Sequence, residues 1–264
     1  MGLILRCNDF MNAKYRNIIV RISFVAICSI FLLGPESYSS ERKVTKNQTR
    51  SPSDDISFSC MGPEGSKINL VYLHGMDSAT PSQQEQTNRG VLAKIANELN
   101  IRIALPRASK PCPTQPNSVC WGWSFNQSEI DSTKGTIEAA AQNCFGTKAH
   151  YGMLGFSNGG YLLSQAYRSC TLQTNFPDGG WLAIVGAARY SGNLPVQPAS
   201  LKGCGSLTIL SGSEDQYNSD LNQNYLHVLA AKGADATEIP YSGGHLLPYP
   251  ELKTALEKLF APLK

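Results

Sequence analysis

Short apolar runs alternate with amphipathic stretches along most of this chain. Runs of strand length lie at 67–73, 101–105, 150–154, 181–185, 207–210 and 237–241. Between them, apolar residues recur every three or four positions, as in Val91, Leu92, Ile95, Ala96 and Leu99. This spacing is typical of a helix with one buried face. The alternation predicts an α/β domain with a mostly parallel central sheet and helices on both faces.

Capping residues indicate where two of these helices begin. Thr80 is a candidate N-cap, with Pro81 at the first helical position and Gln83 completing a capping box. Ser128 is the candidate N-cap of a second helix. The stretch from Pro106 to Gln127 is rich in proline and cysteine, and we interpret it as a long loop.

Residues 1–39 differ from the rest and resemble an export signal. Lys14, Arg16 and Arg21 precede an apolar run from Ile22 to Leu33, which ends at Gly34. About 20 residues are needed to span a membrane, so a cleaved signal peptide is favoured over an uncleaved N-terminal anchor. A start at Met11 would give a leader of more ordinary length. Residues 40–55 are polar and aperiodic, which indicates a flexible linker, and 56–264 form a single predicted domain.

The charge of the chain argues against nucleic acid as a partner. Of 23 basic and 20 acidic residues, four and two lie in the leader, which leaves 19 and 18 for the remainder. A nearly neutral domain without a basic stripe is not expected to bind nucleic acid. A membrane is expected as a partner only through an uncleaved leader.

Six of the eight cysteines follow the leader, an even number that suggests disulfides formed in an oxidising compartment. Cys112–Cys120 is the pairing we favour, because it would close a short proline-rich loop. The other pairings stay open, since six cysteines allow about 15 connectivities. The spacings fit no zinc-ligand pattern, so we expect no metal or cofactor. The protein is therefore expected to be exported, to the periplasm or the medium.

The most informative motif is Gly155-Phe156-Ser157-Asn158-Gly159, which lies between an apolar run and a helix-like run. Strand, sharp Gly-x-Ser-x-Gly turn and helix is the context of a nucleophile elbow, in which the serine hydroxyl is exposed above the sheet. The start of a helix also favours negative charge. The alternative is a serine that only caps the helix. We predict Ser157 as a catalytic nucleophile.

A nucleophilic serine needs a base and an orienting carboxylate. Of the two histidines after Ser157, His227 falls in an amphipathic helix, whereas His245 lies in a glycine-rich loop after the last strand. Loops at the carboxyl ends of parallel strands converge, which favours His245 as the base. The acid should follow the preceding strand, where we choose Asp215, with Glu214 as its immediate rival and Asp220 as a more distant one.

The oxyanion of an acyl-transfer intermediate requires two N–H donors. The backbone N–H of Asn158 follows the nucleophile directly, and we assign the second donor to the backbone N–H of Met76, in the loop after the first long strand. His74, in the same loop, is expected to brace the backbone rather than to react.

These segments together resemble the α/β-hydrolase superfamily: Leu-His-Gly at 73–75, Gly-Phe-Ser-Asn-Gly-Gly at 155–160, Gly-Ser-Glu-Asp at 212–215 and Gly-Gly-His-Leu-Leu-Pro at 243–248. The Cys-Trp-Gly-Trp-Ser-Phe segment at 120–125 is similar to one in polyhydroxybutyrate-depolymerase-like esterases, a group with feruloyl-esterase-like members. Leu-Pro-Arg-Ala at 105–108 is similar to small carboxylesterases and acyl-thioesterases. Met76 departs from the polar residues often found there in the depolymerase group.

The resemblance implies the α/β-hydrolase fold and a serine esterase that acts on a small or polymeric ester. An acyltransferase or a peptidase with the same triad is an alternative, and so is a non-catalytic binding protein of the same fold. Trp121 and Trp123 follow the second predicted strand and are candidates for lining the substrate site; the alternative is that they cover the core.

Overall fold

The computed structural model describes residues 58–123, 126–147, 149–170, 181–185, 200–215 and 219–260. The predicted leader, the linker and the first residues of the predicted domain lie outside these ranges. In the described ranges, no helix is both long enough and apolar enough to cross a membrane.

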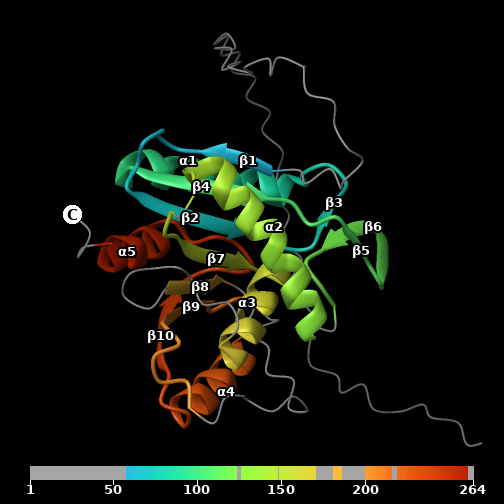
Figure 1. The fold of residues 1–264 in the computed structure, drawn as a ribbon. Coiled ribbons are helices and arrows are strands. Elements are labelled where there is room, and N and C mark those ends of the chain that lie inside the picture. The colour runs from blue at the N-terminus through green and yellow to red at the C-terminus, as the bar shows by residue number, and fades with distance from the viewer. Residues whose placement is uncertain are drawn as a thin grey trace, which may run out of the picture. The chain divides into compact units, whose positions relative to one another are not determined.

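A seven-stranded sheet forms the centre of the fold (Figure 1). Its spatial order is β1 (Phe58–Met61), β4 (Ile101–Pro106), β2 (Ile68–Leu73), β7 (Gly152–Phe156), β8 (Trp181–Val185), β9 (Ser206–Gly212) and β10 (Asp235–Tyr241). All neighbouring pairs are parallel except β1 with β4. The sheet is therefore mostly parallel, as the sequence predicts, and every parallel strand ends at the same edge.

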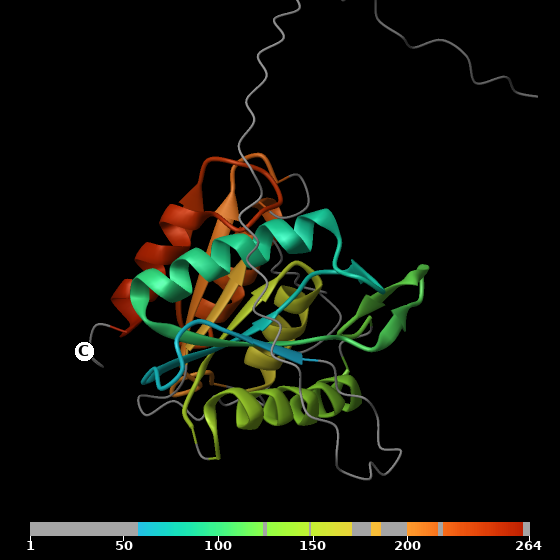
Figure 2. The ribbon, with the colours of Figure 1, turned by 90° about the horizontal axis from the view of Figure 1, so that it is seen from above.

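Helices cover both faces of this sheet, which confirms the predicted architecture (Figure 2). One face carries α1 (Gln83–Leu99) and α5 (Tyr249–Phe260), and the other carries α2 (Gln127–Phe145), α3 (Asn158–Ser169) and α4 (Ser219–Ala230). Each face has its own apolar core, because alternate strand residues point to opposite sides. Val71 and Leu73 pack against α2 and α3, while Leu70 and Tyr72 pack toward α1 and α5.

Both helix starts differ from the predicted ones. The N-cap of α1 is Ser82, whose hydroxyl accepts the Glu85 N–H at 3.2 Å, and not Thr80. The Asp77 carboxylate accepts the Ser82 N–H at 2.9 Å and so fixes where the chain enters the helix. The N-cap of α2 is Asn126, whose side chain accepts the Glu129 N–H at 3.0 Å. Asparagine and serine cap about equally well, so propensity alone does not choose between Asn126 and Ser128.

The predicted loop after β4 contains two strands instead, β5 (Lys110–Cys112) and β6 (Gln115–Cys120). With β3 (Asp77–Ser78), from the loop after β2, they form a small antiparallel sheet in the order β3, β6, β5. Disulfide Cys112–Cys120 joins β5 to β6, which confirms the predicted pairing. Disulfides Cys60–Cys144 and Cys170–Cys204 account for the other four of the six cysteines that follow the predicted leader.

Candidate active site

Ser157 lies in a tight turn between β7 and α3. Its backbone has φ 51° and ψ −114°, a conformation that non-glycine residues rarely adopt. The side chain is half-buried, between the buried residues Phe156 and Asn158. The geometry is that of the predicted elbow, and it places the serine at the carboxyl edge of the sheet.

Two glycines make this turn possible. A Cβ atom on Gly159 would lie 2.3 Å from the carbonyl oxygen of Leu73, and one on Gly155 would lie 2.6 Å from the carbonyl oxygen of Gly159. Both separations are far below van der Waals contact. The start of α3 is thereby drawn against the end of β2, and the Gly159 N–H donates to the carbonyl of His74 at 3.1 Å.

His245 and Asp215 meet at the same edge of the sheet. Nδ1 of His245 lies 2.8 Å from Oδ2 of Asp215, whose side chain is fully buried. Glu214, the rival candidate, is exposed. The imidazole lies 4.8 Å, centroid to centroid, from the ring of Phe156, the residue before Ser157. Because Nδ1 contacts the carboxylate, exchange of a proton with a further group would take place at Nε2.

Two side chains that the sequence did not single out hold the His245 loop. The Tyr241 hydroxyl lies 2.9 Å from the carbonyl oxygen of Gly244 and 3.1 Å from that of Leu246, so it donates to the backbone on both sides of His245. The Gln84 side chain donates to the carbonyl of His245 itself at 2.7 Å. The position of Tyr241 at the end of the last strand, just before Gly-Gly-His, is the feature of the sequence that could have identified it.

His74 braces the neighbouring loop, as expected from the sequence. It is buried; its Nδ1 donates to the Gly75 carbonyl at 2.5 Å, and its Nε2 accepts the Ala108 N–H at 3.1 Å. Burial lowers the pKa of His74 to about 4, and the nearby Arg107 guanidinium adds to this effect. His74 is therefore a neutral structural imidazole that ties the loop after β2 to the segment after β4.

The side chain of Asn158 clamps a third loop to the elbow. Its Oδ1 accepts the Trp121 N–H at 2.8 Å, and its Nδ2 donates to the Gly122 carbonyl at 3.1 Å. Glu129 of α2 accepts the Trp123 N–H at 3.3 Å from the other side. The loop carrying both tryptophans is thus fixed directly beside Ser157, which the sequence did not indicate.

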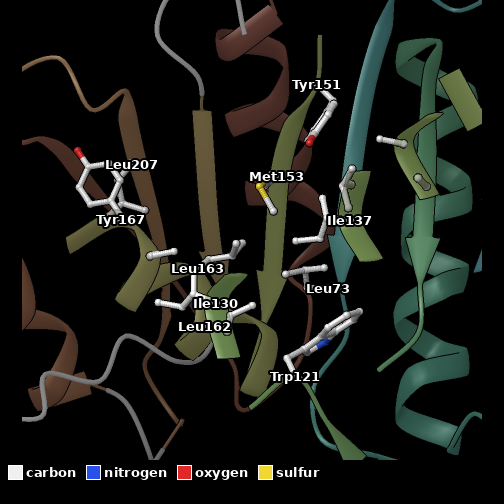
Figure 3. Packing of buried hydrophobic residues seen from close by; sticks show 14 of the residues in the cluster. Leu73, Trp121, Ile130, Ile137, Tyr151, Met153, Leu162, Leu163, Tyr167 and Leu207 are labelled. Carbon is white, nitrogen blue, oxygen red and sulfur yellow. The ribbon is translucent and has the colours of Figure 1, made fainter. Parts of the chain in front are cut away.

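The two tryptophans lie in different environments. Trp121 is only 4% exposed, packs in the core and donates its indole N–H to the His74 carbonyl at 2.9 Å. Figure 3 shows it at the end of the core cluster where Leu73 also lies. Trp123 is 43% exposed. Trp121 therefore covers the core, the alternative considered above, and leaves little surface for a ligand, whereas Trp123 is open to solvent.

The predicted N–H donors lie on the two segments that flank Ser157. Asn158 is the first residue of α3, where backbone N–H groups have no acceptor within the helix. Met76 follows Gly75, and a Cβ atom on Gly75 would lie 3.0 Å from the Cβ of Ser157. Next to it, Asp77 is buried and forms an ion pair with Arg107 at 3.2 Å.

No family model matches this chain, and no curated protein matches it. Several solved structures are similar to it. A Bacillus cereus carboxylesterase has a TM-score of 0.58 and 15% identity, over 80% of this chain and 95% of that one. Zea mays acyl-protein thioesterase 2 has a TM-score of 0.56 and 18% identity, over 79% and 100%. An α/β serine hydrolase without lid from Xanthomonas campestris has a TM-score of 0.51 and 14% identity, over 79% and 89%.

These similarities concern the fold. The strand order, the parallel sheet covered on both faces and the strand–turn–helix elbow are those of the α/β-hydrolase fold, which confirms the predicted fold. The narrower resemblance to polyhydroxybutyrate-depolymerase-like esterases stays a prediction.

Proposed function

We propose that this protein is an exported serine hydrolase that cleaves carboxylic esters with Ser157 as nucleophile, His245 as general base and Asp215 as the orienting acid. The observation that carries the proposal is the 2.8 Å contact between His245 Nδ1 and the fully buried Asp215 carboxylate, at the sheet edge where the strained Ser157 turn lies. A hydrogen-bonded base and acid beside an elbow serine is the arrangement required for acyl transfer.

In the first half of the reaction, the Ser157 oxygen attacks the ester carbonyl and its proton passes to Nε2 of His245. Asp215 stabilises the imidazolium through Nδ1. The carbonyl oxygen becomes an oxyanion, which the backbone N–H groups of Met76 and Asn158 stabilise. The bond to the alcohol oxygen then breaks, and His245 returns the proton to the departing alcohol. An acyl group remains on Ser157.

In the second half, His245 removes a proton from water, and the resulting hydroxide attacks the acyl carbonyl. The bond to the Ser157 oxygen breaks, that oxygen regains the proton, and the carboxylic acid is released.

The test is hydrolysis of p-nitrophenyl acetate by the purified chain and by Ser157→Ala. Loss of the nucleophile should lower kcat by about 10⁴-fold or more. Ser164→Ala is a matched control, because Ser164 lies about two turns further along α3 and its hydroxyl donates to the Tyr161 carbonyl. Undiminished hydrolysis in Ser157→Ala would refute the proposal.

Export is supported by the three disulfides, since such bonds persist in oxidising compartments. We place the enzyme in the periplasm or the medium, with residues 1–39 removed. Mass spectrometry of the protein recovered after expression with its leader tests this. An intact N-terminus in the cytoplasmic fraction would contradict it.

A further inference from the structure

Exposed apolar side chains gather around the proposed nucleophile. Four large hydrophobic side chains are exposed in the described part of the chain: Met76 at 39%, Trp123 at 43%, Leu246 at 44% and Phe58 at 36%. Isolated apolar residues on a surface need no explanation, whereas a cluster around one site does. Three of these four belong to the loops that converge on Ser157.

Each of the three directly follows a residue that contacts the elbow. Met76 follows Gly75, which approaches Ser157 closely enough for a Cβ atom to lie at 3.0 Å. Trp123 follows Gly122, whose carbonyl accepts from Asn158 at 3.1 Å. Leu246 follows His245, whose ring lies 4.8 Å from that of Phe156. We call Met76, Trp123 and Leu246 the apolar rim.

Side-chain hydrogen bonds hold the backbone of two of the three rim segments. The Trp123 segment is fixed by Asn158 and by Glu129, and the Leu246 segment is fixed by Tyr241. Rigid loops lose little conformational entropy when a ligand binds, so exposed side chains on them can contribute most of their contact energy to binding. The apolar character therefore has a fixed position relative to the reacting groups.

The charge of these segments offers no cation to an anionic substrate group. Residues 74–78, 121–123 and 243–247 contain one aspartate or glutamate, Asp77, and no lysine or arginine. Asp77 is buried and paired with Arg107, so neither charge is available to a ligand. Glu214, exposed beside the acid of the pair, would repel a carboxylate or a phosphate.

We infer, on the basis of the proposed ester hydrolysis, that the substrate is an uncharged ester with apolar groups on both sides of its carbonyl, and that the apolar rim determines this specificity. The proton transfers of the reaction determine which rim residues face the alcohol and which face the acyl chain. The alcohol oxygen receives its proton from His245, so the alcohol lies toward Leu246. The acyl chain points away from His245, toward Met76 and Trp123.

The acyl side is tested by comparing p-nitrophenyl octanoate with p-nitrophenyl acetate. The native chain should prefer octanoate in kcat/KM, since each methylene that is buried contributes a factor of about four. Trp123→Ala should lower the octanoate-to-acetate ratio of kcat/KM about tenfold, and Met76→Ala should lower it several-fold. Phe58→Ala is the matched control, because Phe58 lies on edge strand β1, three strands from β7, and should leave the ratio unchanged.

The alcohol side is tested with octyl acetate against ethyl acetate, measured as acetate released. Leu246→Ala should lower the preference for the octyl ester several-fold and leave the acyl preference unchanged. Circular dichroism of each variant confirms that it is folded; a variant that does not fold is replaced by Trp123→Ser or Leu246→Ser.

The two proposals fail in different ways. Ser157-dependent hydrolysis with no preference for octanoate, or with the same ratio in Trp123→Ala and native protein, would overturn the apolar rim and leave the esterase intact. Leu246→Ala changing only the acyl preference would overturn the assignment of sides. Absence of any Ser157-dependent hydrolysis would overturn the esterase proposal, and the rim with it.

Discussion

Replacing Tyr241 by phenylalanine removes one hydroxyl and should cost far more in catalysis than in stability. That hydroxyl lies 2.9 Å and 3.1 Å from the two carbonyl oxygens that flank His245. Burial raises the pKa of Tyr241 to about 12, and the nearby Asp215 charge acts in the same direction. The hydroxyl therefore keeps its proton, and remains a donor, throughout the working pH range.

The expected loss of stability follows from the number of hydrogen bonds that the hydroxyl can donate. One O–H proton is shared between two acceptors, so its loss corresponds to about one net hydrogen bond, or about 1 kcal/mol of unfolding free energy. Because the loop is half-exposed, water replaces part of this lost hydrogen bonding. Catalysis is more sensitive, because a displacement of about 1 Å in a reacting group can cost about 100-fold. We expect kcat to fall at least tenfold, with KM within about twofold of the native value.

The assay pairs urea unfolding with p-nitrophenyl acetate kinetics for Tyr241→Phe and for Tyr167→Phe. Tyr167 is a matched control: it is buried, its pKa is likewise raised to about 12 by burial, and its hydroxyl donates to the Gly205 carbonyl at 3.0 Å. The two variants should lose similar stability, and only Tyr241→Phe should lose kcat. If both retain kcat within twofold, Tyr241 has only a structural role and the reasoning is wrong.

Three further predictions concern stability. His74 has a pKa of about 4 in the folded protein and about 6.5 in the unfolded chain, so the unfolded chain binds a proton first and stability should fall by up to about 3 kcal/mol as pH drops from 6.5 to 4. The urea midpoint of His74→Gln should decline less steeply over this range than that of the native protein. Parallel curves would contradict the assignment. Gly159→Ala places a Cβ atom 2.3 Å from the Leu73 carbonyl oxygen and should lower the free energy of unfolding by about 3 kcal/mol or more. Gly135→Ala, in α2 with open space around it, should raise that free energy by about 0.5–1 kcal/mol. Equal shifts of the thermal unfolding midpoint in the two variants would refute this. Replacing Cys60 and Cys144 by alanine should lower the free energy of unfolding by about 4.5 kcal/mol, and replacing Cys112 and Cys120 by about 2.5 kcal/mol. The first bridge costs more to lose because it spans 84 residues and the second spans 8. The reverse order in urea unfolding would contradict this argument from loop entropy.

Strands β2, β4 and β7 were predictable because they are buried on both faces and read as continuous apolar runs. The predicted strand at 181–185 matches β8, and those at 67–73 and 101–105 differ from β2 and β4 by one residue. Strand β1 was missed, since its half-exposed residues Phe58–Met61 carry no apolar run. The hairpin of β5 and β6 was missed because its strands are largely polar.

For the candidate site, chain order and loop position were enough to bring Asp215 and His245 together, because loops at the carboxyl ends of parallel strands meet. The contacts that support them were not predictable. Tyr241 and Gln84 act on backbone carbonyls, and Asn158 clamps a segment 36 residues away through its side chain. Such contacts depend on the packed backbone and leave no periodic pattern in the sequence.

The most direct test of the central claim is labelling of the purified chain without residues 1–39 by a fluorophosphonate, with the adduct located by mass spectrometry. The account predicts a single adduct on Ser157, lost in Ser157→Ala and retained in Ser164→Ala. A folded, oxidised protein that carries no adduct, or carries it on another residue, would contradict Ser157 as an activated nucleophile.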